Sequence, residues 1–175
     1  FTDLEYYQML VKAAGIEAVI ERNWQLISGF GMQNYARLVV DEWGCWHPEG
    51  SGPSQGRNLF EQQSTMRDAL VAALTLNVFN NHCDKVRMAN IAQLANNLHC
   101  LFLANEKNCI TTPTYHVFDM YQQHQGGNAI RCIGDDDDSV IASSDPRQPT
   151  ALASLSHSAS IRNKVLTLTI ANLSL

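Results

Sequence analysis

Apolar residues along most of the chain follow the spacing of alternating helices and buried strands. They recur near helical spacing from Leu4 to Ile27, from Met66 to Phe79 and from Tyr115 to Gln123. The run Leu38–Val40 is apolar without polar alternation, which is typical of a strand buried on both faces, and Val86 to Ala92 predicts the next strand. This order of strand, helix and strand predicts a β/α unit with two parallel strands.

Two local signals refine the helix ends. Thr65 and Asp68 have the spacing of a capping box, in which a hydroxyl and a carboxylate bind the free N–H groups at a helix start. Gly15 weakens the middle of the first helical segment. We therefore expect a well-defined start for the second helix and a weak point in the first.

The pattern changes near Arg131. Residues 131–150 are polar and rich in turn-forming side chains, and predict a linker. Leu152 to Ser160 and Val165 to Ile170 then alternate as antiparallel strands do, joined by Arg162-Asn163. We therefore predict an α/β domain over 1–130 and the start of an all-β domain over 151–175.

Composition and charge narrow the class of protein. The formal net charge is -5 and the pI is about 5.6, without a basic cluster, which disfavours nucleic acid as a partner. No apolar run approaches the roughly 20 residues that span a bilayer, so we expect no membrane segment and a cytoplasmic location. The five cysteines are odd in number and contain no Cys-x-x-Cys pair, which favours reduced thiols.

The sequence predicts no metal site and no cofactor. The histidines and cysteines lack the spacing of zinc ligands. The run Asp135–Asp138 lacks the alternating oxygen ligands and the closing Glu of a calcium loop, so we expect a solvated linker there.

The segment directly after the first strand contains the candidate chemistry. A strand predicted from Ala36 to Glu42 ends in two acids, and Trp46 and His47 follow closely. The carboxyl ends of parallel strands are where α/β sheets and barrels place their reactive groups. Glu42 is therefore the candidate reactive carboxylate, with aromatic rings nearby to contact a sugar. The alternative from the residues alone is that these are ordinary strand-end acids.

Four blocks of sequence resemble the glycoside hydrolase family 51 α-L-arabinofuranosidases. They are Asp-Glu-Trp-Gly-Cys-Trp-His at 41–47, Arg-Asp-Ala-Leu-Val-Ala-Ala-Leu-Thr-Leu-Asn-Val-Phe at 67–79, Met-Ala-Asn-Ile-Ala-Gln-Leu-Ala-Asn at 88–96 and Thr-Pro-Thr-Tyr-His-Val-Phe-Asp-Met-Tyr at 112–121. The resemblance implies the C-terminal portion of a (β/α)8 TIM barrel followed by the beginning of a β-sandwich.

The same resemblance implies roles for individual residues. Glu42 stands where the family has its catalytic nucleophile, and Gln93 where a side chain reaches the arabinose hydroxyls. Trp46 stands at a wall of the sugar pocket, and His47, which follows it, is a further candidate substrate contact. The alternatives are a Gln93 that caps the next helix and a Trp46 that packs at the barrel rim.

The resemblance also implies that one catalytic group lies outside this chain. In the family the acid/base Glu follows an Asn on an earlier barrel strand, whereas the sole Asn-Glu pair here, Asn105-Glu106, lies in a predicted turn downstream of Glu42. We expect this chain to be the C-terminal part of the barrel, inactive without the N-terminal part as its partner.

Three functions remain open from the sequence. The first is a retaining arabinofuranosidase acting on an arabinose-containing oligo- or polysaccharide. The second is a non-catalytic fragment or carbohydrate-contacting module. The third is another retaining barrel glycosidase, such as a xylosidase or endoglucanase. The sequence leaves open whether the chain forms a homo-oligomer.

Overall fold

A computed structural model describes residues 2–48, 51–52, 60–134, 139–141 and 151–175. The run Asp135–Asp138, most of the predicted linker and part of the polar loop after His47 lie outside the described residues. Within the described residues, no helix is both long enough and apolar enough to span a bilayer.

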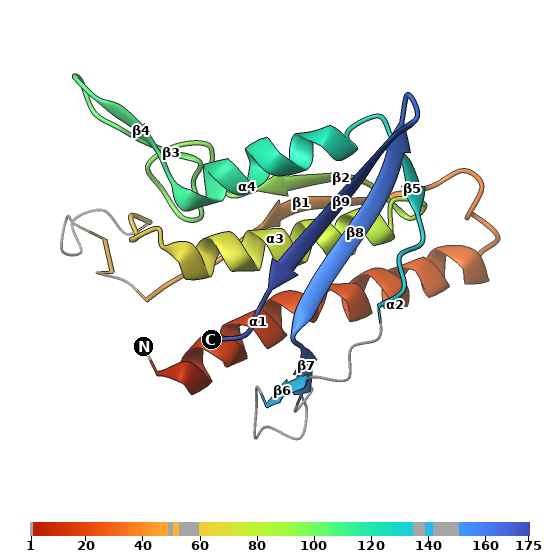
Figure 1. Ribbon diagram of the computed structural model, residues 1–175. Coiled ribbons are helices and arrows are strands. Elements are labelled where there is room, and N and C mark those ends of the chain that lie inside the picture. Colours follow the sequence, from red (N-terminus) through yellow and green to blue (C-terminus); the bar gives the residue numbers. More distant parts are fainter. Residues whose placement is uncertain (1, 49–50, 53–59, 135–138, 142–150) are drawn as a thin grey trace.

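The two predicted strands pair in parallel. Strands β1 (Leu38–Trp43) and β2 (Val86–Ile91) form a two-stranded sheet, and α3 (Met66–Asn81) crosses between them. Leu38 pairs with Val86 and Trp43 with Ile91, so the two strands end at the same edge. The predicted β/α unit is confirmed, and Figure 1 shows it at the back of the molecule.

The remaining helices lie beside α3. The first helical segment is divided at Gly15 into α1 (Asp3–Ala14) and α2 (Ile16–Gly29), at the predicted weak point. Helix α4 (Pro113–Tyr121) begins with a proline at its first position and is followed by the 3-10 turn η1 (Gln122–His124). The predicted capping box of α3 is present, with both Thr65 and Asp68 taking part.

A short hairpin projects from the loop after β2. It consists of β3 (Phe102–Ala104) and β4 (Cys109–Thr111), which pair antiparallel. Asn105 and Glu106 lie in the turn between these strands, as predicted. This places the Asn-Glu pair outside the β1–β2 sheet.

The C-terminal segment forms antiparallel sheets. Strands β5 (Asn128–Ile130), β8 (Leu155–Arg162) and β9 (Val165–Asn172) form one sheet, and β6 (Ser139–Ile141) pairs with β7 (Ala151–Ala153). The turn of the β8–β9 hairpin is Asn163–Lys164, one residue later than predicted, because Arg162 pairs with Val165. Both turn residues have positive φ, as a tight two-residue hairpin requires.

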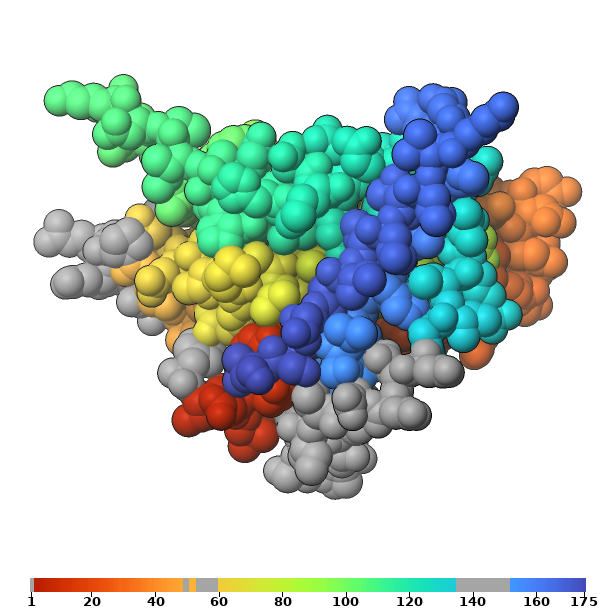
Figure 2. Space-filling view, viewed as in Figure 1, coloured from red at the N-terminus to blue at the C-terminus, as the bar shows by residue number. Residues whose placement is uncertain are grey.

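The β8–β9 hairpin lies across α3 with its polar face inward. Figures 1 and 2 show the hairpin in blue crossing the helix in yellow. Ser158 and Ser160 are buried on the side toward the helix, whereas Leu166, Leu168 and Ile170 are exposed on the opposite face. The alternation was predicted, but hydrophobicity alone does not indicate which face is buried. A β-sandwich buries such an apolar face against a second sheet.

Helix α3 is buried on nearly all sides. Its buried residues include Ala69, Ala72 and Leu74 as well as Asp68 and Asn77. A helix that is buried all round needs partners on more than one side. Phe79 of α3 packs against Trp43 of the parallel sheet, and the β8–β9 hairpin contacts the helix on another side.

The domain division remains a prediction. Strand β5 precedes residue 131 but pairs with β8, so the C-terminal sheet includes residues from before the expected boundary. The β1–β2 pair with its helices has the α/β arrangement expected of a barrel segment, and the barrel itself remains a prediction.

We predict that Asn77→Ala weakens the contact between α3 and the hairpin. The buried Asn77 accepts hydrogen bonds from Ser158 (2.8 Å) and Thr169 (2.9 Å) and donates to Ser156 (3.1 Å). Removing the amide leaves buried hydroxyls without this partner, at a cost of about 1 to 3 kcal/mol. Urea unfolding would measure the loss. The exposed control Asn34→Ala should change the free energy of unfolding by less than about 0.5 kcal/mol, and equal effects would contradict the prediction.

Candidate functional site

The carboxyl ends of β1 and β2 bring the two main candidate residues to one edge. The Ala92 N–H donates to the Trp43 carbonyl at 2.9 Å, which joins the strands at their last residues. Glu42 precedes Trp43 and Gln93 follows Ala92, so both stand at this edge, and both side chains are exposed.

Glu42 faces away from the helices. Trp43 is only 8% exposed and packs against Phe79 of α3 and Phe118 of α4, with ring centroids 5.5 and 6.0 Å apart. The Glu42 side chain is exposed, and it directly precedes the buried Trp43, which places it on the open face of the sheet. The pairing is irregular between Val40 and Trp43, which leaves Asp41 and Glu42 both exposed. No partner among the described residues binds the Glu42 carboxylate.

The loop after β1 alternates between buried and exposed side chains. Cys45 and His47 are buried, whereas Trp46 between them is 65% exposed and contacts Phe60 edge-to-face at 5.6 Å. Gly44 precedes this loop with φ of +140°, and a Cβ there would come within 2.7 Å of the His99 Cβ. Close approach of the chain to His99 therefore requires glycine at this position.

The ring of His47 is held by α3. Its Nε2 lies 2.6 Å from Asp68 and 2.8 Å from the guanidinium of Arg67. Since one ring nitrogen cannot donate to a carboxylate and also accept from a guanidinium, the shorter contact favours an N–H directed at Asp68. Burial alone would raise the pKa of Asp68, but hydrogen bonds from His47 and Thr65 outweigh burial and lower it to about 2.

Comparison with known proteins identifies the family. A family model described as the α-L-arabinofuranosidase C-terminal domain matches residues 41–173. The chain belongs to this family. A curated relative from Bacteroides ovatus, an intracellular exo-α-L-arabinofuranosidase, is 38% identical over 125 residues, which cover 71% of this chain and 24% of that protein.

Solved arabinofuranosidase structures share the fold. The family 51 enzyme from Xanthomonas axonopodis pv. citri has a TM-score of 0.77 and 29% identity, covering 99% of this chain and 34% of that one. The arabinose complex from Thermotoga maritima has the same TM-score at 19% identity, which shows the fold alone, covering 98% of this chain and 36% of that one. The resemblance to family 51 is therefore confirmed, and the chain corresponds to the C-terminal part of these enzymes.

The four predicted site residues occupy different environments in this chain. Glu42, Gln93 and Trp46 are exposed near the carboxyl ends of the strands. His47 is buried against Asp68, which favours a supporting role rather than the sugar contact expected from the sequence. The catalytic and binding roles themselves remain predictions.

Sequence reasoning missed three residues near this site. Gln62 and Phe60 come from a polar segment without periodicity, so no local signal marks them. His99 interrupts an apolar run, and a single polar side chain in such a run indicates a buried group that needs partners. That signal could have identified His99.

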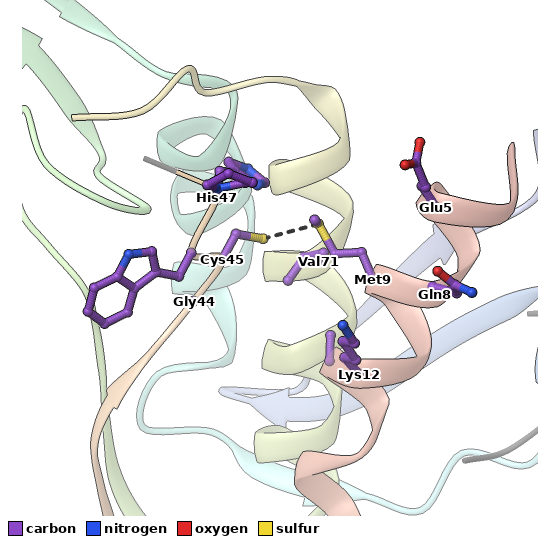
Figure 3. A pocket seen from close by; sticks show the side chains of 11 residues that line it. Glu5, Gln8, Met9, Lys12, Gly44, Cys45, His47 and Val71 are labelled. Carbon is purple, nitrogen blue, oxygen red and sulfur yellow. Dashed lines mark hydrogen bonds between the residues drawn. The ribbon is translucent and has the colours of Figure 1, made fainter. Parts of the chain in front are cut away.

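A cavity of about 490 Å³ lies between α1 and the loop after β1. Met9 and Lys12 line it from α1, and Cys45 and His47 from the loop, with the Cys45 Sγ 3.8 Å from the Met9 Sδ (Figure 3). Trp46 also lines the cavity, so the cavity reaches the exposed indole but is not lined by Glu42.

The side chains beside this cavity are a poor fit for a metal ion. Ligand atoms of Cys45, His47 and Asp68 lie within 4.8 Å of one another. However, the Arg67 guanidinium already places a positive charge 3.7 Å from Asp68 and contacts His47. Burial, with the nearby Asp68 charge, raises the pKa of the Cys45 thiol and disfavours the thiolate that a metal would need.

His99 joins the segments that follow both strands. Its Nδ1 accepts the Cys45 N–H at 2.9 Å, its Nε2 lies 2.9 Å from the Thr114 hydroxyl, and its own N–H donates to the Ala92 carbonyl at 2.7 Å. Since Nδ1 is an acceptor, the neutral ring holds its proton on Nε2. Burial is the main cause that lowers the pKa of His99 from 6.5 to about 4.

We predict that His99 makes this chain less stable in mild acid. His99 becomes protonated below pH 6.5 in the unfolded chain, but only below about pH 4 in the folded chain. The contribution of the neutral His99 ring to the free energy of unfolding is therefore complete above pH 6.5. It declines by about 3 kcal/mol as the pH falls to 4. Urea unfolding at several pH values would measure the slope of the unfolding free energy against pH, and His99→Asn should make this slope less steep.

An exposed histidine provides the matched control. His116→Asn should leave the slope as it is in the unmodified chain. His124, whose pKa is also lowered by burial, adds to the slope and is retained in every variant. An unchanged slope in His99→Asn would contradict the assignment of His99 as a buried neutral ring.

Proposed function

We propose that this chain supplies the nucleophile side of a retaining α-L-arabinofuranosidase active site. The substrates would be terminal α-L-arabinofuranosyl groups of arabinan, arabinoxylan or arabino-oligosaccharides. The observation that carries the proposal is the place of Glu42, exposed on the open face at the carboxyl end of β1 in a chain of this family.

The proposed chemistry requires a second carboxyl group. A retaining glycosidase places two carboxyl groups about 5 to 5.5 Å apart, one as nucleophile and one as acid/base. Glu42 would attack the anomeric carbon while the second group protonates the leaving oxygen. Water would then release the sugar, with the second group acting as base. That group would come from an earlier strand on the opposing wall.

Other residues of this chain would hold the sugar. Gln93, exposed beside the end of β2, would hydrogen-bond to arabinose hydroxyls. The exposed indole of Trp46 would pack against the sugar ring, since an aromatic face covers C–H groups well. His47, held by its contact with Asp68, would fix the backbone next to Trp46.

The unpaired edges of the β1–β2 sheet support the proposal that further strands complete it. Within the described residues, β1 pairs only with β2, so each strand has one unpaired edge. Such edges are unfavourable unless another strand covers them. The chain spans only about a quarter of the Bacteroides relative, and we propose that the remaining strands complete the barrel. The name of that relative also supports a cytoplasmic location.

We predict that Glu42→Gln abolishes turnover in the completed enzyme. The amide keeps the shape of the site but removes the attacking oxygen, so the glycosyl-enzyme cannot form and turnover should fall by several orders of magnitude. A mechanism-based arabinofuranosyl inhibitor should label Glu42, as read by peptide mass, and label nothing in the variant.

The matched comparison is Gln93→Ala, which keeps the nucleophile. The Gln93→Ala variant should still be labelled at Glu42. Its kcat/KM should fall by roughly tenfold to a hundredfold, because it loses hydrogen bonds worth about 1 to 3 kcal/mol. Labelling at Asp41 or Glu61 in the unmodified enzyme would contradict the assignment of Glu42 as the nucleophile.

A further inference from the structure

The backbone on both sides of Trp46 is bound by one buried side chain. Gln62 is 4% exposed, and its Nε2 donates to the Cys45 carbonyl at 3.1 Å while its Oε1 accepts the His47 N–H at 3.0 Å. These two backbone groups flank Trp46 directly. The carboxamide therefore binds this short segment as a neighbouring strand would.

Two further contacts restrict the same segment. His99 accepts the Cys45 N–H at 2.9 Å, and Asp68 holds the His47 ring at 2.6 Å. With its neighbours fixed on both sides, Trp46 projects outward and meets the ring of Phe60 edge-to-face. Gln62 differs from the other two anchors because its single amide binds both neighbours of Trp46 at once.

We infer that Gln62 is a positioning residue that fixes the Trp46 indole as a contact surface for the sugar. The inference rests on the proposed function, because it assigns Gln62 to the surface that Trp46 provides. Its physical basis is preorganisation: a side chain already held in its bound position loses less freedom when the substrate binds. Gln62 would therefore act on substrate binding and leave the chemistry at Glu42 largely unchanged.

The test combines kinetics with a direct view of the indole in the complete enzyme. Gln62→Met keeps the length of the side chain but can form neither backbone hydrogen bond. It should raise KM for an aryl arabinofuranoside by about tenfold with kcat within about threefold. Gln62→Glu can still accept from His47 but cannot donate to Cys45, so its KM should be intermediate. The neighbouring, exposed Gln63→Met is the matched control and should leave KM unchanged.

A double-mutant cycle separates positioning from general damage. Trp46→Ala should raise KM, and adding Gln62→Met to it should raise KM little further, because Gln62 acts through Trp46. Effects that simply multiply in the double variant would overturn the inference.

Fluorine NMR with 5-fluorotryptophan makes the outcome independent of activity. The Trp46 resonance, identified by its loss in Trp46→Phe, should broaden or shift in Gln62→Met and stay unchanged in Gln63→Met. An unchanged Trp46 resonance in Gln62→Met would overturn the inference even if KM rises. An unchanged KM in Trp46→Ala would instead contradict the proposed role of Trp46, while the fluorine spectrum would still decide whether Gln62 holds the indole.

Discussion

The burial of α3 on opposite sides is the constraint on which the rest of the structure depends. Along its length Phe79 packs against Trp43 of the parallel sheet, while Asn77 binds the hydroxyls of the β8–β9 hairpin. At its N-terminus Asp68 caps the helix and also holds His47. One helix thus joins the sheet, the C-terminal hairpin and the loop that presents Trp46.

The two interfaces of α3 differ in their chemistry. The side toward the sheet is apolar and aromatic, so its stability comes mainly from removing apolar surface from water. The side toward the hairpin contains a buried network of amides and hydroxyls, in which each group depends on the others being present. This polar interface is specific in orientation, because a hairpin shifted by one residue would present its apolar face to Asn77.

The sequence predicts those parts of the fold that local patterns determine. The strand at β1, the helical spacing of α3 and its capping box depend on residues close together in the chain, and each is confirmed. The expected burial of β1 on both faces is wrong for these residues, because Val39 is 47% exposed on the face away from the helices. The placement of Glu42 and Gln93 at one edge follows from parallel pairing alone.

Long-range polar contacts could not be predicted in this way. Gln62 binds the backbone 15 and 17 residues away and His99 binds Cys45 at a separation of 54, and no periodicity encodes such pairs. The same limit applies to His47, whose contact with Asp68 joins residues 21 positions apart, so that the sequence alone gives no sign of the pair.

We propose that this chain provides a nucleophile but needs earlier barrel strands for turnover. The most direct measurement is hydrolysis of a chromogenic arabinofuranoside by the 175 residues alone and after mixing with a polypeptide that supplies those strands. We predict no turnover from the chain alone, and turnover from the mixture that Glu42→Gln abolishes. Full activity from the isolated chain would contradict it.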